Sequence, residues 1–411
     1  MTDDLLRSRA TVFFRLILVI PAWIALLFWT IGAFFVVIGA WFVLLVRGRC
    51  SDGMHEFLAS YVRYAIQVSA YIHLVANPWP GFSPKADYPV RVEIDGPVAQ
   101  RGRSVFFRLF LALPALLLAG ATGGSAGLSV PRRSGRYGFG SGVAGAAGIG
   151  AVLGWFACLA RGRMPRGLRD LGAYSVGYTA QAYAYLLLLT DRYPSADPRL
   201  AGPQELPPHP VRLELTDDLQ RPRLLVAFRL LLVLPHLVWL ALWTVAAFLA
   251  VVAAWWVALV TGRVPDTVHR FLAAYVRYAA HVGAFLYLVG GPFPGFVGAE
   301  RSYPIAILIG PPEGQRRSTI LFRVFLAFPA LLLAGGYGGI AWTAAVLGWF
   351  YALARGRMPR GLRDIGASAI RYQAQAWAYL LLLTPAYPYS APTLENTAEP
   401  HDEQIALELG V

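Results

Sequence analysis

Four long apolar runs divide the chain, and each ends at a glycine followed by an arginine. The first run, Leu16 to Val46, contains no charged residue and no histidine. One helix of that length would reach about 46 Å, well beyond a hydrocarbon core of about 30 Å. The fourth run contains glycines at 335, 336, 338 and 339, and the second holds an inserted Gly/Ser/Arg segment, roughly residues 122–142, at the same place. Because insertions are tolerated in loops, we expect two short helices and a tight turn in each run rather than one tilted helix.

The same spacing of residues recurs four times, which defines a sequence repeat. Each run opens with Phe-Arg and a proline six residues after the arginine, and a tyrosine follows the closing glycine by sixteen residues. The arginines are Arg15, Arg108, Arg229 and Arg323, the glycines are Gly48, Gly162, Gly262 and Gly356, and the tyrosines are Tyr64, Tyr178, Tyr278 and Tyr372. Copy one resembles copy three, and copy two resembles copy four. The order A-B-A-B indicates duplication of a two-unit ancestor.

We therefore predict four tandem units and a tail. Residues 1–87 and 201–302 form the A units, residues 88–200 and 303–391 form the B units, and residues 392–411 form a polar tail with a candidate short strand. The Pro-rich stretch from Tyr193 to Pro210 reads as the linker between the two halves.

A third stretch with helical periodicity follows each Gly-Arg pair. Its polar residues recur at steps of four, three and four, which places them on one stripe of a helix. The stripe includes Arg63 and Gln67 in copy one, Arg277 and His281 in copy three, and Arg371 and Gln375 in copy four. This helix either spans the membrane or lies flat among the headgroups. The flat position is favoured, because three spans per unit would place the arginines of alternate units outside.

Short segments with alternating apolar and polar residues lie at the unit boundaries. Val90 to Asp95, Val211 to Leu215 and Tyr303 to Leu308 are predicted strands. No such segment precedes copy one. The segment Ile405 to Leu409 at the C-terminus is a candidate for the missing partner strand.

Composition supports a membrane location. The chain has 411 residues, of which 57% are hydrophobic and 14% are charged, so it is too apolar for an ordinary soluble domain. Its net charge of +13 comes almost wholly from arginine, since Lys85 is the only lysine. The arginines flank apolar runs instead of forming a stripe on a polar domain, which favours anionic lipids over nucleic acid as the partner.

Clusters of arginine at the ends of the apolar runs are the candidate contacts to anionic lipid headgroups. They are Arg47, Arg49, Arg161, Arg163, Arg166, Arg169, Arg263, Arg355, Arg357, Arg360 and Arg363. Positive residues face the cytoplasm, so we predict a multi-pass inner-membrane protein with both termini cytoplasmic. An alternative is that these arginines only fix the membrane topology, without binding specific headgroups. Arg132, Arg133 and Arg136 in the copy-two insert would lie outside and depart from this rule.

The sequence offers no constellation for catalysis. All 23 acidic residues fall outside the apolar runs, which argues against coupled transport and against paired-carboxylate chemistry there. Cys50 and Cys158 are far apart and no Cys/His cluster exists, so neither a disulfide nor a metal site is expected. The glycine-rich stretch 138–150 lacks the strand and helix of a nucleotide-binding unit. We predict no catalytic residue, no cofactor and no enzyme activity.

The repeated motif Tyr-Pro, strand, Phe-Arg-x(5)-Pro, apolar run, Gly-Arg-x-Pro and tyrosine-rich helix resembles bacterial membrane proteins that carry domain of unknown function 4389. The likeness is carried by Tyr88-Pro89, Phe107-Arg108, Pro114, Gly162 to Pro165 and Tyr178, with their counterparts in the other copies. It implies no established activity.

The fold class expected is an all-α polytopic membrane protein. It comprises four tandem units of a two-helix transmembrane hairpin plus an amphipathic interfacial helix, with short cytoplasmic strands between units. The function expected is a non-enzymatic structural, scaffold or regulatory role in contact with anionic lipids. The alternative is a passive transporter or channel built from the internal repeats.

Overall fold

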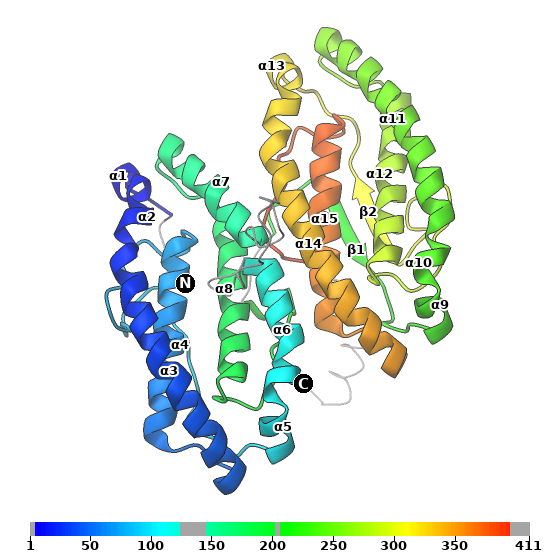
Figure 1. Ribbon diagram of the computed structural model, residues 1–411. Helices are drawn as coiled ribbons and strands as arrows, with labels where there is room; N and C mark the ends of the chain where they lie inside the picture. Colours follow the sequence, from blue (N-terminus) through cyan, green and yellow to red (C-terminus); the bar gives the residue numbers. More distant parts are fainter. Residues whose placement is uncertain (1–4, 124–144, 202–205, 395–411) are drawn as a thin grey trace, which may run out of the picture. The chain divides into compact units, whose positions relative to one another are not determined.

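The computed structural model describes residues 5–123, 145–201 and 206–394 and is mostly helical, with a few short strands (Figure 1). It divides into two compact units, residues 1–196 and 197–411, and each contains two of the four sequence repeats. The finer boundaries between the four predicted segments stay a prediction.

The elements of the first unit are α1 (Arg9–Phe13), α2 (Arg15–Leu18), α3 (Ile20–Arg47), α4 (Asp52–Ile72), α5 (Gly102–Phe106), α6 (Arg108–Gly123), α7 (Ala146–Arg161) and α8 (Arg166–Leu186). Those of the second are η1 (Pro198–Ala201), β1 (Val211–Leu215), α9 (Arg223–Ala227), α10 (Arg229–Leu232), α11 (Leu234–Thr261), α12 (Asp266–Leu286), β2 (Ile305–Ile309), α13 (Arg317–Leu321), α14 (Arg323–Arg355) and α15 (Arg360–Leu380).

The predicted turn inside each apolar run is wrong for three of the four repeats, because α3, α11 and α14 continue through it as single helices. In apolar surroundings every backbone N–H and C=O must find a partner within the chain, and a continuous helix provides all of them. The glycines of α14 do not break it. No atom lies within 4 Å of a Cβ built on Gly335 or Gly339. In copy two the insert falls largely on residues 124–144, which lie outside the described residues.

The helices do break at the phenylalanine of each Phe-Arg motif, where φ lies between −94° and −86° and ψ is close to zero. This break frees a backbone carbonyl two residues earlier, and a tryptophan of the other repeat in the same unit donates to it. Trp155 donates its indole N–H to Val12 over 2.9 Å, and Trp41 donates to Val105 over 3.1 Å. The second unit repeats this exchange with Trp349 and Trp255. Each repeat therefore binds the start of its neighbour.

Within the second unit both the long helices and the strands pack against the two amphipathic helices. Helices α12 and α15 contact each other, α11 packs on α12, and α14 packs on α15 (Figure 1). Strand β2 lies on α12 and β1 lies on α15, and the two strands pair antiparallel with Leu213 opposite Ile307. The first unit repeats the helices, with α3 on α4 and both α6 and α7 on α8.

The predicted strand Val90 to Asp95 is wrong for the described part of the first unit, where these residues carry no ladder. The candidate strand Ile405 to Leu409 lies outside the described residues. The predicted strands at 211–215 and at 303–308 correspond to β1 and β2. A strand needs a neighbour to accept and donate its backbone hydrogen bonds. The described residues of the first unit provide none beside 90–94.

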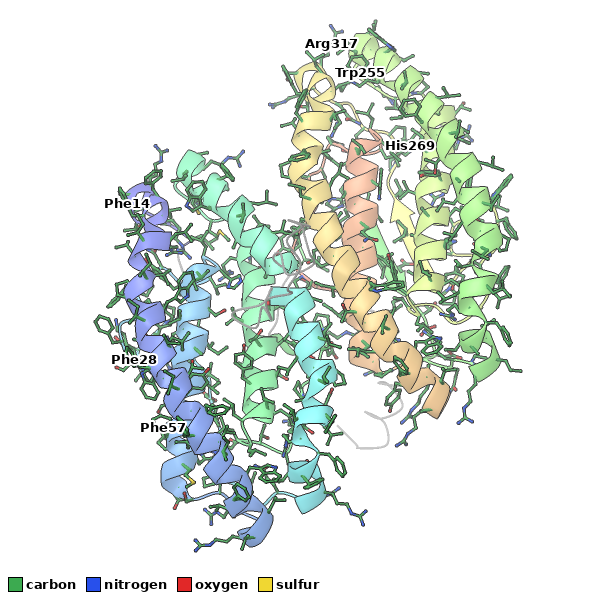
Figure 2. All side chains as sticks on the ribbon, in the orientation of Figure 1. Phe14, Phe28, Phe57, Trp255, His269 and Arg317 are labelled. Atoms are coloured by element: carbon green, nitrogen blue, oxygen red, sulfur yellow. The ribbon has the colours of Figure 1, made fainter. Side chains whose placement is uncertain are left out.

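Three helices, Arg15–Arg47, Arg229–Thr261 and Arg323–Arg355, are long and apolar enough to cross a membrane. Each has 33 residues, and only 17% of the apolar window in the first and 11% in the second is buried. Their outer faces carry exposed phenylalanine, leucine, isoleucine and valine side chains. Figure 2 shows Phe28 pointing outward from α3. A broad apolar surface is thus left for lipid or for a partner.

Candidate functional site

The arginine of each Phe-Arg motif is buried beside the end of the amphipathic helix in its own repeat. In the third repeat, Arg229 donates to the carbonyl oxygens of Phe285, Gly290 and Gly291 over 2.7, 3.2 and 3.0 Å. The last carbonyls of a helix have no partner within the helix, and the guanidinium supplies one. The positive charge also faces the negative end of the helix dipole.

All four copies bury the arginine at this place, but only the A repeats put it on a carbonyl of the last helical turn. The acceptors in the B repeats follow the helix ends by four residues. Arg15 donates to Tyr71 and Ala76, Arg108 donates to Thr190, and Arg323 donates to Thr384. In each copy the guanidinium carbon lies between 4.1 and 4.3 Å from the ring centroid of an aromatic residue in the capped helix; these residues are Tyr71, Tyr185, Phe285 and Tyr379. Cation–π contact and charge-assisted hydrogen bonds therefore hold each buried arginine.

A second polar residue lies eight positions before each capping arginine and binds the same helix end. It is Arg7 or Arg221 in the A repeats and Gln100 or Gln315 in the B repeats, and it donates to the carbonyl of Leu74, Leu288, Leu188 or Leu382 respectively. These four leucines have φ between 60° and 62°, a left-handed conformation that is rare for leucine. The alternation of arginine and glutamine matches the A-B-A-B order of the sequence.

Buried charges join the repeats of the second unit. Arg221 pairs with Asp217 over 2.8 Å, and Arg363 pairs with Asp364 over 2.7 Å and donates to the Asp217 carbonyl. Burial raises the pKa of the Asp364 carboxyl, and the adjacent Arg363 opposes that rise. Arg363 is fully buried, which removes it from the candidate lipid contacts.

The other arginine clusters lie at the ends of the long helices. Exposed members are Arg47, Arg49, Arg161, Arg163, Arg166, Arg263, Arg355 and Arg357, and half-buried members are Arg169 and Arg360. Arg49 and Arg263 form exposed ion pairs with Asp52 and Asp266, and Arg169 pairs with Asp170.

The polar stripe of the second unit contacts the strand layer. Arg371 is buried and donates to the carbonyls of Tyr389 and Ala391. Gln375 donates to the Val211 carbonyl of β1 over 3.0 Å, and Arg277 donates to the Ile307 carbonyl of β2 over 3.2 Å. Through these hydrogen bonds Gln375 holds β1 against α15, and Arg277 holds β2 against α12.

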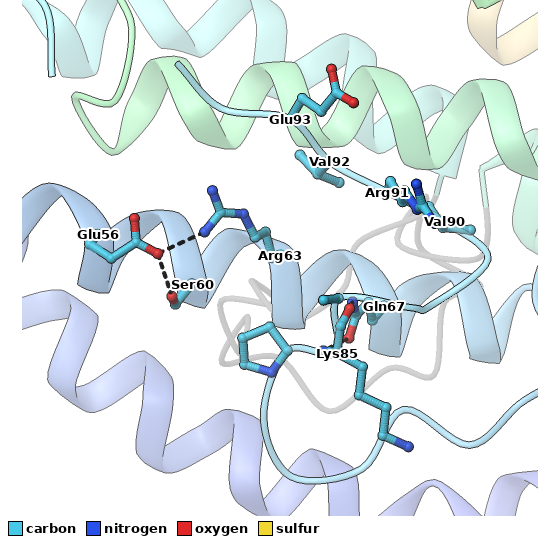
Figure 3. Close-up of a pocket in the computed structure, with 11 residues that line it drawn as sticks. Glu56, Ser60, Arg63, Gln67, Lys85, Val90, Arg91, Val92 and Glu93 are labelled. Atoms are coloured by element: carbon cyan, nitrogen blue, oxygen red, sulfur yellow. Dashed lines mark hydrogen bonds and ion pairs between the residues drawn. The ribbon is translucent and has the colours of Figure 1, made fainter. Parts of the chain in front are cut away.

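A groove of about 400 Å³ opens over the stripe of the first unit (Figure 3). Arg63 pairs there with Glu56 over 2.9 Å, and Gln67 exchanges two hydrogen bonds with the backbone of Lys85. In the second unit Gly298, with φ of +60°, approaches α12 so closely that a Cβ would lie 2.3 Å from the Ala274 oxygen. The first unit has Pro84 at that position.

His281 takes the place of the glutamine in the third repeat. It is 1% exposed, its ring lies 5.1 Å from that of Tyr303, and burial lowers its pKa to about 4. The tryptophan donors, the residues eight positions before the arginine, and the Asp217 pair were not anticipated from the sequence. The residues eight positions before each capping arginine could have been predicted, because this spacing is constant in all four repeats. Among the described residues no group of three His, Cys, Asp or Glu side chains is arranged to hold a metal ion.

The family model of the domain of unknown function (DUF4389) matches the chain four times, over residues 9–83, 141–196, 223–295 and 317–391. These matches cover more than half of the chain. The protein therefore belongs to this family and carries its domain in four copies, which confirms the resemblance seen in the sequence. No curated protein matches the chain, and no solved structure does.

We predict that Arg229→Met lowers the free energy of unfolding by about 3 kcal/mol or more, because three buried carbonyls lose their donor. Arg223→Met is the matched control. Arg223 is exposed and donates only to Ala354, so its loss costs under about 1 kcal/mol. Chemical unfolding in detergent measures both variants. Equal losses would show that the capping arginine has no special role.

We predict that His281→Gln, which installs the residue found at the other three equivalent positions, removes a pH dependence of stability. The lowered pKa of His281 means that folding favours its neutral form. The stability it contributes is therefore complete above about pH 6.5 and is lost as pH falls toward about 4. At pH 5 the variant should gain about 2 kcal/mol relative to the native chain, with a smaller difference at pH 8. Unfolding midpoints at both values measure this, and parallel pH curves would contradict it.

Proposed function

We propose that the protein is a non-enzymatic membrane scaffold whose long helices embed in the inner membrane and whose exposed arginines bind anionic lipid headgroups. The observation that carries this proposal is the combination of exposed apolar helix surfaces with exposed arginines at the helix ends. Apolar area gives membrane binding, and each arginine near an anionic surface adds about 1 kcal/mol. The absence of acidic residues from the apolar runs supports the non-enzymatic part.

The pairing of the long helices supports an arrangement in the plane of the membrane. Arg9 at the start of one run donates to Ala160 near the end of the other, and Arg223 and Arg317 make the same contact to Ala354 and Val260. The two runs of a unit are thus antiparallel, and arginines lie at both ends. Crossing would leave one cluster on the outer surface, against the positive-inside rule, whereas a flat position brings both clusters to the cytoplasmic surface.

Helix length and the strand layer support the same arrangement. A helix of 33 residues is about 50 Å long, so it would have to tilt by about 50° to fit a core of about 30 Å. Observed tilts reach about 40°. Strands β1 and β2 bind the middle of α15 and α12 through Gln375 and Arg277. Crossing would put an open sheet edge at hydrocarbon depth, where none is tolerated.

In the flat arrangement both termini lie on the cytoplasmic side, as in the multi-pass topology predicted from the sequence. The alternative of a passive transporter or channel needs polar stripes that line a common path. In the second unit Arg371 and Gln375 are buried against the following segments and β1, which supports a packing role.

The lipid part is tested by removing two exposed arginines. Arg355→Gln/Arg357→Gln should lower affinity for an anionic lipid about five-fold per arginine, since each contact contributes about 1 kcal/mol. Arg91→Gln/Arg212→Gln removes the same charge from exposed positions away from the helix ends. Native mass spectrometry of protein titrated with phosphatidylglycerol reports bound lipid. Equal loss in both variants, or no loss in either, would refute a specific role for the helix-end arginines.

The arrangement is tested by depth measurements along the third apolar run. Leu231, Val245 and Val260 are all exposed and lie on one face at 3.6 residues per turn. Spin labels at these positions should report one common shallow depth in liposomes. A crossing helix would instead place the label at 245 near the bilayer centre and the labels at 231 and 260 near opposite surfaces. That result would overturn the flat arrangement but would leave the lipid contacts standing.

A further inference from the structure

The groove of the first unit contains an arginine that makes fewer bonds than its counterpart in the second unit. Arg277 of the second unit donates to the Ile307 carbonyl and pairs with Glu300, and its side chain is 14% exposed. Arg63 is the equivalent residue of α4, and its side chain is 30% exposed. Among the described residues its guanidinium bonds only to Glu56, through Nη1. Nε and Nη2 are therefore left to donate to a ligand.

The carboxylate that pairs with the arginine of the second unit comes from a loop, and the groove of the first unit has no such loop carboxylate. Glu300 lies between α12 and β2, four residues after a Gly-Phe pair. The same count from the Gly-Phe pair of the first unit reaches Ala86, which lines the groove. Asp87, the next residue, does not line it. The place of a carboxylate beside Arg63 is thus open on the loop side.

Two donors of α4 meet at one oxygen on the helix side of the groove (Figure 3). Arg63 Nη1 lies 2.9 Å and the Ser60 hydroxyl 3.4 Å from Oε1 of Glu56. The second unit has arginine and alanine at the two equivalent positions, 270 and 274, so it lacks both this carboxylate and this hydroxyl. The Glu56 side chain is 67% exposed. An exposed ion pair contributes little free energy, so another anion can replace Glu56 on these donors.

The charges around the groove favour an anion with more than one negative charge. Arg91 and Lys85 line the groove together with Arg63. Lys85 donates its ammonium group to a backbone carbonyl, which leaves its positive charge unneutralised. Glu93 also lines the groove, but Figure 3 shows its carboxylate directed away from α4. A phosphate group, with about 1.5 to 2 negative charges and several acceptor oxygens, matches three cations better than one carboxylate does.

We propose that this groove is a binding site for a phosphate group, carried either by a lipid headgroup or by a small phosphate ester. The phosphate takes the place of the Glu56 carboxylate and accepts hydrogen bonds from Arg63 and Ser60. Arg91 and Lys85 raise the positive potential around it. The groove volume of about 400 Å³ lies within the range of about 300–1,000 Å³ of small-ligand sites. The site does not rest on the scaffold proposal, because it uses none of the arginines at the ends of the long helices.

Removal of the arginine tests the site in the full chain, purified in a neutral detergent. Arg63→Gln should weaken the binding of glycerol 3-phosphate by about ten-fold or more, the change expected when a charge-assisted hydrogen bond is lost. Arg270→Gln is the matched control, because it removes an exposed charge from the equivalent helix of the second unit and should leave binding unchanged. Isothermal titration calorimetry measures this probe, and native mass spectrometry measures bound phosphatidylglycerol. An effect of Arg63→Gln on the lipid alone would assign the phosphate to a headgroup.

Carboxylates added to the groove or removed from it give an independent test. Ala86→Glu places a carboxylate at the position of Glu300 and should block binding, whereas Ala86→Gln, of the same shape, should retain it. Ala86 is exposed, so both variants should fold. Glu56→Gln removes the competing carboxylate and should strengthen binding several-fold. Binding of both probes that is unchanged in Arg63→Gln, or that falls equally in Arg63→Gln and Arg270→Gln, would overturn the site.

Discussion

The rest of the fold depends on a buried guanidinium placed against the end of a helix. In each repeat the apolar run starts with a break at phenylalanine, and the next residue turns its charge inward. Its carbonyl acceptors lie in the last turn of the amphipathic helix in the A repeats and just beyond the helix in the B repeats. A buried arginine is costly unless its donors are satisfied, so the end of one helix and the start of the other must meet at a fixed place. This requirement brings Phe-Arg to the end of the later helix in all four repeats, although the second repeat carries an insert between them.

The break that admits the arginine also couples the repeats in pairs. It frees a carbonyl that a tryptophan of the neighbouring repeat binds, as Trp155 does at Val12. An A repeat and a B repeat therefore complete each other, and the compact units are pairs of repeats. The exposed arginines differ from the buried ones in position, because they lie at helix ends beside exposed apolar surface. Arg229 and Arg355 are both arginines at one end of an apolar run. Arg229 is nevertheless buried as a cap, whereas Arg355 is exposed.

Some features of the chain depart from the pattern that the four repeats share. Pro84, in place of Gly298, lines the groove of the first unit, and His281 in place of glutamine introduces a buried titratable group in the third repeat. A third departure is the segment 90–94, which carries no ladder in the described part of the first unit, whereas its counterpart is β2. Because each departure has a regular counterpart in another repeat, the chain contains its own control for every one of them.

From the sequence alone, periodicity and spacing determined the four repeats, their A-B-A-B order, the family, and the largely helical content, because these are properties of local pattern. The tertiary structure decided three further points. It made three of the four apolar runs continuous helices, since glycines such as Gly339 cost little where every backbone group must be bonded within the chain. It buried Arg363 and Arg371 among partners distant in sequence. It also left Val90–Ile94 without a ladder, because a strand forms only where a neighbouring segment is present to pair with it.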